Sequence, residues 1–286
     1  MNTRRRSYIL EDNEKTFIYE EFYDENRNII KTSDHRENPP AEEYFKYNAK
    51  GLLIHQIDIQ NGIENSSQSF EYDENDAIID VKTFIGGDLC EHMHCSRTPT
   101  GFIQILTQDG EEFERMEKIE QGDNWSSRLY RYGELIESQE YVYDPSSKTG
   151  FTSIKNTEEH TTFFIREKYN ADDKLIFTEE FNEDETLLQS TEILIDNAST
   201  YKELIHDYTN GKSIYENLYE FDNSENITYF EARSLSGDLL SFHKRSYNSD
   251  NWLIEETGVT NKNHYGIFGI HDQYKGFHII HEYENI

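Results

Sequence analysis

The chain contains few of the residues that interrupt strands or cross-link a fold. It has 286 residues but only four prolines and two cysteines. So few prolines leave long strands uninterrupted, and two cysteines in a chain of this length do not make a disulfide framework. No run of about eighteen apolar residues occurs, which excludes a membrane-spanning helix. Helical periods are also scarce, and residues 110–119 fit a helix and a strand equally well.

Basic residues are scarce as well. Twenty-seven lysines and arginines stand against 57 aspartates and glutamates, which gives a net charge of −30. A chain this acidic repels phosphates and anionic lipid headgroups, so we expect neither nucleic acid nor membrane as a partner. No apolar segment follows the arginines at residues 4–6. The N-terminus therefore does not resemble a secretory signal, and we expect a cytoplasmic protein.

Aromatic residues are abundant. The hydrophobic fraction is only 35% and the mean hydropathy is −0.89, values that usually suggest disorder. The chain nevertheless has 20 tyrosines and 17 phenylalanines. Aromatic rings bury large areas, and a tyrosine can keep its hydroxyl at the surface. The composition therefore favours a folded chain with a thin core, as in a sheet of repeats.

A short phrase recurs along the chain. An aromatic residue is followed by Asp or Asn, a few small polar residues and a pair of aliphatic residues. Clear and looser copies begin at Tyr23, Tyr47, Tyr72, Tyr143, Tyr169, Phe181, Phe221 and Tyr247. Most steps are multiples of about 24 residues, and one step of 12 is half a unit. A unit of this length matches a β-hairpin, with two strands and two turns.

Each part of the phrase has a role in a hairpin. The aromatic residue ends an incoming strand, and the Asp or Asn starts a turn because its side chain bonds its own backbone. Gly51, Gly237 and Asn28 fall where a positive φ is expected. We therefore predict an all-β fold of tandem β-hairpin repeats, about 24 residues each, forming one elongated, twisted antiparallel sheet.

The predicted organisation is a single repeat domain over residues 1–286. No linker rich in Gly, Ser or Pro divides the chain. We expect an N-terminal arm at 1–14, repeats at 15–256 and a C-terminal cap at 257–286.

The recurring phrase resembles the YD repeats of RHS-type proteins. It is also similar to the hairpin repeats of MORN-like antitoxin proteins from bacterial polymorphic toxin systems. The resemblance covers residues 15–256. RHS proteins are very large shells with a toxin at the C-terminus, and 286 residues are too few to enclose such a cargo. What the resemblance implies here is a compact module of β repeats.

One segment has the residue types of a metal site. On a strand, Cys90, His92 and His94 would share a face, with Cys95 beside them. Zinc normally takes a fourth ligand, and the spacing of Cys90 and Cys95 matches no familiar zinc motif. A strand with incidental histidines explains the segment better, so we predict no metal and no cofactor.

Two other segments are candidate sites. His264, His271, His278 and His281 lie near the C-terminus among aromatics and glycines, where a capping element is the simpler interpretation. Asp109, Glu111, Glu112 and Glu114 form an acidic cluster where the repeat is least regular. Paired carboxylates suggest a glycosidase, but in a chain with 57 acids such pairs arise by chance.

The sequence leads to three hypotheses about function. The first is a non-catalytic immunity protein that occludes a cognate, basic toxin such as a nuclease, with Asp109, Glu111, Glu112 and Glu114 as the predicted contact acids. The alternative is a module that binds carbohydrate or a surface polymer through exposed aromatics. The third is a hydrolase that uses carboxylates. We expect the first, and hence no enzyme activity.

Overall fold

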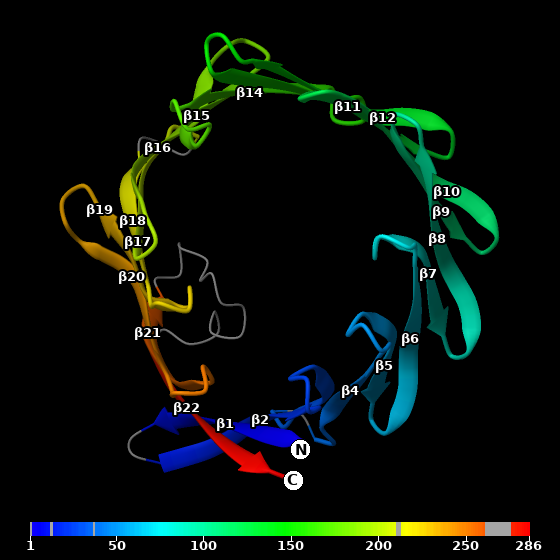
Figure 1. The fold of residues 1–286 in the computed structure, drawn as a ribbon, viewed down its shortest axis with the longest axis vertical. Coiled ribbons are helices and arrows are strands. Elements are labelled where there is room, and N and C mark those ends of the chain that lie inside the picture. Colours follow the sequence, from blue (N-terminus) through cyan, green and yellow to red (C-terminus); the bar gives the residue numbers. More distant parts are fainter. Residues whose placement is uncertain (1, 12–13, 37, 210–212, 261–275) are drawn as a thin grey trace. The chain divides into compact units, whose positions relative to one another are not determined.

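The chain folds almost entirely into β-strands. In the computed structural model, residues 2–11, 14–36, 38–209, 213–260 and 276–286 are described, and they contain 22 strands and no helix (Figure 1). The all-β prediction is confirmed, and residues 111–119 belong to a strand, after a turn at Gly110. Accordingly, no helix in the described ranges is long and apolar enough to span a membrane.

The strands are as follows. The first eleven are β1 (Thr3–Glu11), β2 (Glu14–Tyr23), β3 (Ile29–Asp34), β4 (Ala41–Tyr47), β5 (Leu53–Gln60), β6 (Ile63–Tyr72), β7 (Ile78–Ile85), β8 (Asp88–Thr98), β9 (Gly101–Gln108), β10 (Glu111–Gln121) and β11 (Asn124–Arg131). The others are β12 (Glu134–Asp144), β13 (Thr149–Asn156), β14 (Thr161–Tyr169), β15 (Leu175–Asn182), β16 (Leu187–Asp196), β17 (Thr200–Asp207), β18 (Ser213–Phe221), β19 (Ile227–Ser234), β20 (Leu239–Tyr247), β21 (Leu253–Thr260) and β22 (Gly276–Asn285).

The chain divides into two compact units, which we describe separately. Unit 1 comprises Met1–Ile9, Lys15–Ser138 and His281–Ile286, and unit 2 comprises Leu10–Glu14 and Gln139–Ile280. Within each unit, strands that follow one another in the sequence pair antiparallel, as β4 does with β5 and β17 with β18. The predicted hairpin array is therefore present in both units.

Both ends of the chain form strands. Residues 3–11, expected as an arm, form strand β1, and residues 276–285 form strand β22. In unit 1, β1 pairs with β22 as well as with β2, and the Ile286 amide donates to the Asn2 carbonyl at 3.0 Å. An elongated sheet would leave its first and last strands as unpaired edges, so that part of the prediction is wrong.

The Asp or Asn of the repeated phrase organises a five-residue turn. Its Oδ1 accepts hydrogen bonds from the backbone amides two and four residues later, at 2.8 to 3.1 Å. One side-chain oxygen thus holds the whole turn. These turns are residues 24–28, 48–52, 73–77, 170–174, 182–186, 222–226 and 248–252.

The fourth residue of each five-residue turn has a positive φ. Gly51 (80°) has it as predicted, and so does Gly237 (88°) in the equivalent turn at 234–238, which begins with Ser234. The prediction for Asn28 is wrong, because Arg27 (66°) occupies that position. Asp, Glu and Asn fill the same position in other copies. The two hydrogen bonds to the leading side chain stabilise the positive φ of the fourth residue, so that a glycine is not required. The positions of the glycines in the sequence therefore do not mark most of these turns.

The leading tyrosine of the phrase ties one repeat to the previous one. Tyr47 Oη donates to the carbonyl of Ile29 at 2.8 Å, and Tyr72 Oη donates to that of Leu53 at 2.6 Å. Ile29 and Leu53 each follow a five-residue turn. The aromatic residue therefore packs on the sheet and also satisfies a backbone acceptor in the neighbouring hairpin.

A row of rings crosses unit 2, and three of the rings are buried. Neighbouring ring centroids in the row lie 4.9 to 6.0 Å apart. The rings belong to Tyr201, Tyr219, Phe230, His243 and Phe277. Gly258, on β21, lies under the Phe277 ring, since a Cβ there would come within 2.6 Å of that ring. Gly258 thus lets the row continue from β22 to β20.

The core of unit 1 contains a buried charge. The Arg5 guanidinium forms an ion pair with Glu21, and Tyr23 Oη donates to the same carboxylate. Burial alone would lower the pKa of Arg5, but the charge of Glu21 raises it. Burial raises the pKa of the Tyr23 hydroxyl. Breaking such a pair by removing one partner is strongly destabilising, because it leaves a buried charge uncompensated.

Candidate interaction surface

Four consecutive hairpins of unit 1 end at the same edge of the sheet. Antiparallel pairing runs from β5 through β10, and β11 and β12 continue it, so the connections β5–β6, β7–β8, β9–β10 and β11–β12 all lie at one edge (Figure 1). We call their tips, residues 60–64, 85–89, 108–112 and 131–135, the hairpin-tip surface. Backbone bonds join two of the tips to the preceding hairpin: Asp109 N donates to Cys90 O of β8 at 3.0 Å, and Tyr132 N donates to Phe113 O of β10 at 2.9 Å.

The four tips are tight two-residue turns. Both central residues have a positive φ in each of them, for example Asn61 (54°) with Gly62 (73°) and Asp109 (51°) with Gly110 (84°). This is the geometry of the type I′ turn, which matches the twist of two antiparallel strands.

Exposed apolar side chains gather on these tips. Ile63 is 71% exposed, Tyr132 72%, Ile85 55% and Leu89 47%, and Leu135 is exposed as well. At the other edge of the same strands, Ile78 and Ile119 are exposed. Single exposed apolar residues are normal, but several on consecutive tips are typical of an interaction surface.

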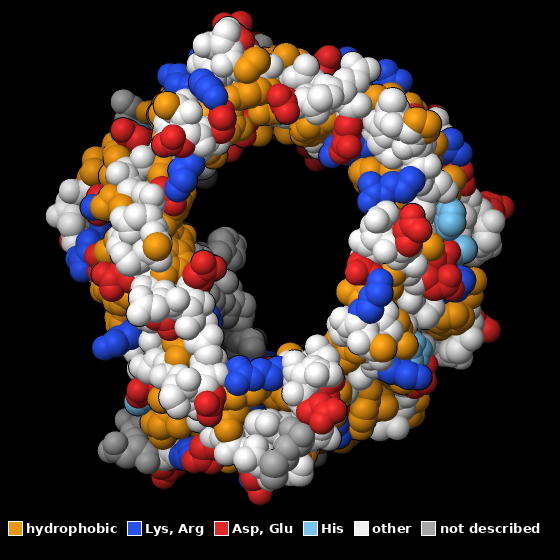
Figure 2. Space-filling model, in the orientation of Figure 1, with side chains coloured by type: hydrophobic (Ala, Val, Ile, Leu, Met, Phe, Trp, Pro, Cys, Tyr) orange, Lys and Arg blue, Asp and Glu red, His pale blue; other side chains and the backbone are white. Residues whose placement is uncertain are grey.

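Acidic side chains surround these apolar residues. The exposed acids of the four tips are Glu64, Asp88, Asp109, Glu111, Glu112 and Glu134. Within the same twenty residues the only basic residue is Arg131, and it pairs with Glu114. Figure 2 shows acidic, basic and hydrophobic side chains interspersed over the face in view. The hairpin-tip surface is therefore locally acidic as well as apolar.

The structure places three of the four predicted contact acids directly on this surface. Asp109, Glu111 and Glu112 belong to the β9–β10 tip, and Glu112 accepts two bonds from Arg115, at 3.0 and 3.1 Å. Glu114 lies further along β10, half-buried, with Arg131 Nε and Nη2 at 3.0 and 2.9 Å. Glu114 and Glu112 therefore each hold an arginine side chain, while Asp109 and Glu111 are exposed at the tip. Their role in binding stays a prediction.

The Cys90–Cys95 segment lies on β8. His92 Nε2 and His94 Nδ1 approach Asp80 Oδ2 at 2.6 and 3.4 Å, while the register shift at Thr83/Phe84 leaves Cys90 out of the pairing. Cys95 follows His94, so it points to the opposite face. The sequence did not reveal Asp80, because only the register of β7 against β8 brings it there.

Asp80 already has basic neighbours. Its Oδ1 lies 3.0 Å from Lys82 Nζ. Burial alone would raise the pKa of Asp80, but hydrogen bonds from His92 and Lys82 lower it below its usual range. Within the described ranges, no group of three or more His, Cys, Asp or Glu is placed to hold a metal ion.

Two of the C-terminal histidines lie on β22. His278 Nε2 is 2.6 Å from Glu255 in unit 2, and His281 Nδ1 is 2.8 Å from the buried Ser7 hydroxyl in unit 1. His264 and His271 lie outside the described residues. Both described histidines join β22 to a neighbouring strand, which fits a structural role.

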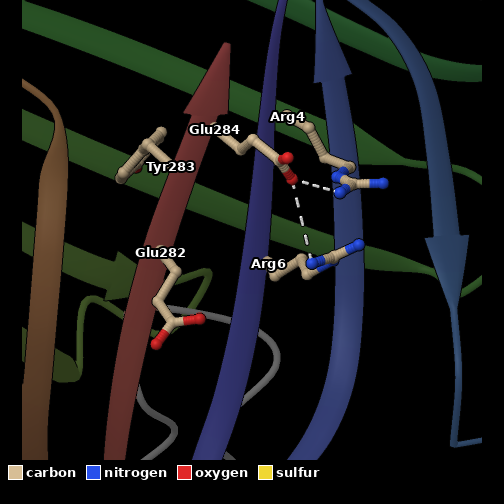
Figure 3. A pocket seen from close by; sticks show the side chains of 5 residues that line it. All are labelled: Arg4, Arg6, Glu282, Tyr283 and Glu284. Atoms are coloured by element: carbon tan, nitrogen blue, oxygen red, sulfur yellow. Dashed lines mark hydrogen bonds and ion pairs between the residues drawn. The ribbon is translucent and has the colours of Figure 1, made fainter. Parts of the chain in front are cut away.

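A pocket of about 360 Å³ lies where β1 meets β22 in unit 1. Figure 3 shows the Glu284 carboxylate directed at Arg4 and Arg6, with Tyr283 directed away from both. Arg4 and Arg6 also contact Glu20, at 3.6 and 3.1 Å. Each guanidinium thus has carboxylate partners, and the pocket is better explained as an ion-pair network that holds the two strands together.

Comparisons with known proteins identify no family. No protein-family model and no curated protein matches the chain. Among solved structures, a porin-like protein from Bacteroides uniformis matches with 9% identity and a TM-score of 0.33, over 99% of this chain and 96% of that one. The TcdB2-TccC3 structure matches with 9% identity and a TM-score of 0.26, over 88% of this chain.

The Photorhabdus luminescens Tc holotoxin pore also matches, with 10% identity and a TM-score of 0.22, over 86% of this chain. This chain spans 22% of the TcdB2-TccC3 chain and 22% of the holotoxin chain. These scores are too low to support an argument about function.

Proposed function

We propose that this chain is a non-catalytic protein that binds and covers a basic protein partner, and that its role is that of an immunity protein against a toxin. The observation that carries the proposal is the hairpin-tip surface. Five exposed apolar side chains and six exposed acids occupy four consecutive tips there. Apolar residues with an acidic surround fit a partner whose surface is apolar at its centre and basic at its rim.

The size of the hairpin-tip surface suits a protein partner. Successive tips at one edge are two strand spacings apart, about 10 Å, so four tips span about 30 Å. A standard protein interface buries about 800 Å² on each partner, which is a patch of similar width. A small molecule, in contrast, is usually held in a concave pocket that buries most of its surface. We therefore favour occlusion of a protein surface.

Charge supports a basic partner. The net charge of −30 attracts a cationic protein from a distance and raises the rate of association. A nuclease toxin carries a basic surface to bind phosphate, and an acidic inhibitor competes with nucleic acid for that surface. Within this proposal, acids set the rate of encounter, whereas the apolar tips supply most of the affinity.

The test is to co-express this chain with the protein encoded by the adjacent gene. We expect protection from its toxicity, and a complex between this chain and a catalytically inactive form of that protein in calorimetry. Association should weaken from low to high salt, because salt screens exposed charges. If the chain gives no protection and forms no complex, the proposal is wrong. An association rate that does not depend on salt would contradict the steering argument.

One observation favours carbohydrate binding as a second candidate. On β13 and β14 in unit 2, the exposed ring of Phe151 stacks on Phe164, with centroids 5.7 Å apart and planes 21° apart. Arg166 lies over the neighbouring Phe181 ring at 5.1 Å. Exposed rings of this kind can stack on sugars. Binding of a glycan library that is lost in Phe151→Ala, without binding of any toxin, would favour this candidate.

A further inference from the structure

We infer that Tyr132 is the anchor residue of the hairpin-tip surface and that it inserts into an apolar pocket rimmed by Lys and Arg on the partner. The inference rests on the proposed function and makes it more specific. Three features of Tyr132 carry it: its backbone conformation, the way its ring is held, and the charges around it.

The backbone conformation at Tyr132 is one that tyrosine adopts less readily than Asn, Asp or Gly. Tyr132 (φ 49°) and Gly133 (φ 79°) are the central pair of the β11–β12 turn. The first position of this turn type is normally Asn, Asp or Gly, because a bulky side chain is strained at positive φ. Asn61 and Asp109 occupy the same position in two other tips. Of the described non-glycine residues with positive φ, Tyr132 alone is a Tyr, Phe or Trp.

The Tyr132 ring is held although it is exposed. It makes an edge-to-face contact with Phe113, with centroids 5.2 Å apart. The Phe113 ring in turn lies 5.7 Å from the Arg131 guanidinium, which Glu114 fixes from the neighbouring strand. Even so, 72% of Tyr132 remains exposed. A ring already held in one orientation loses little conformational entropy when a partner covers it.

The surroundings of Tyr132 define the chemistry of the partner. Glu134 follows two residues later on the same tip, and Glu111 and Glu112 lie on the neighbouring β9–β10 tip. A large aromatic residue with acids around it is the usual arrangement of an interaction hot spot whose partner is basic. The partner therefore needs an apolar pocket for the ring and cations at its edge for the carboxylates.

The experiment replaces Tyr132 with Asn and measures stability and binding separately. Tyr132→Asn relieves the backbone strain but loses the contact with Phe113, so we expect a melting temperature equal to that of the wild type or about 2–4 °C higher. Affinity for the catalytically inactive protein encoded by the adjacent gene should fall at least roughly 30-fold. Asn251→Tyr is the control: it places a tyrosine at a positive φ (66°) in the turn at 248–252, outside the hairpin-tip surface, and we expect a lower melting temperature with little change in affinity.

The outcomes separate the two proposals. If the wild-type chain forms no complex, the proposed function fails and the anchor role fails with it. If the wild type binds and Tyr132→Asn binds equally well, the anchor role alone is wrong. A drop of several degrees in the melting temperature of Tyr132→Asn would also overturn the inference, because it would make Tyr132 a structural residue.

Discussion

The two edges of the hairpins in unit 1 carry similar residue types in different arrangements. At one edge, the five-residue turns at 24–28, 48–52 and 73–77 begin with Asp or Asn, and that side chain bonds its own backbone. At the other edge, the hairpin-tip surface has two-residue turns, and its acids are exposed. At the first edge, the hydroxyls of Tyr47 and Tyr72 donate to backbone carbonyls. At the second edge, Tyr132 is exposed.

This difference shows that the role of an acidic residue depends on the turn in which it lies. Asp24 and Asp109 both begin a turn, but Asp24 accepts two backbone amides while Asp109 is an exposed residue at the tip of a tight turn. The amino-acid composition does not distinguish the two residues. We therefore expect the five-residue turns to matter for stability and the hairpin-tip surface to matter for binding, and the predictions below test that separation.

The largest expected effect is on stability. Replacing the leading residues of three five-residue turns (Asp24→Ala, Asn48→Ala and Asp73→Ala) should lower the free energy of unfolding by about 3 kcal/mol, roughly 1 for each turn. The reason is that each change leaves two backbone amides without their acceptor. Urea denaturation measures the loss, and affinity for the partner should not change.

The matched control for these turns removes three acids of the other edge. Glu64→Ala, Asp88→Ala and Glu134→Ala should each change the free energy of unfolding by less than about 0.5 kcal/mol, because these side chains are exposed. If combining these three substitutions lowers the free energy of unfolding as much as the three substitutions in the five-residue turns do, the two edges do not differ in their contribution to stability.

The next effect is on the rate of association. Asp109→Asn, Glu111→Gln and Glu112→Gln together should lower the association rate constant about tenfold at low salt, with a much smaller effect at high salt. Stopped-flow mixing with the partner measures it. Glu183→Gln, Asp184→Asn and Glu185→Gln make the same change in net charge on the β15–β16 turn of unit 2. If that control slows association equally, the steering comes from total charge and not from the hairpin-tip surface.

A smaller effect on stability is expected from removing the hydroxyl groups of two tyrosines. Tyr47→Phe removes the hydroxyl that bonds the Ile29 carbonyl, so the free energy of unfolding should fall by about 1 kcal/mol. Tyr132→Phe removes an exposed hydroxyl and should leave stability unchanged. Chemical denaturation of both variants measures the difference. A loss in Tyr132→Phe as large as that in Tyr47→Phe would contradict the assignment of the two edges.

The smallest effect is a pH dependence. Burial alone would raise the pKa of Asp24, but hydrogen bonds from Asn28 and Asn26 lower it below its ordinary value of 3.8. Because the folded-state pKa is depressed, the stabilisation is present above that value and is lost as the pH falls through the lower folded-state pKa. Carbon-13 NMR of the carboxyl groups measures the titration. Asp24→Asn keeps the turn and should remove this part of the acid sensitivity; an Asp24 that titrates above 3.8 would contradict the mechanism.

The sequence predicted the strands well because their signal is local. The repeated phrase places an aromatic residue at a strand end and Asp or Asn in a turn, and both preferences act within a few residues. Residues 110–119 were ambiguous for the same reason, because a short stretch fits two periods until its neighbours pair with it. The positive φ at Arg27 was missed, since hydrogen bonds to Asp24 replace the glycine that would have marked it.

The interaction surface was only partly visible in the sequence. Asp109, Glu111 and Glu112 stand out as a run of acids, but Ile63, Ile85 and Tyr132 lie 22 and 47 residues apart in sequence order. They meet at one edge only because each hairpin returns the chain to that edge. Glu114 was assigned to binding from its position in the run, although the structure pairs it with Arg131.

The sequence by itself determined the hairpin unit, the strand content, the acidic charge and the residues that form the turns, because these depend on neighbours along the chain. Only the tertiary structure decided that β1 pairs with β22 and that Asp80 meets His92 and His94. It also decided that Tyr132 lies among acids from other hairpins. These facts depend on strand register, which is set by contacts between residues far apart in the sequence and leaves no local pattern to read.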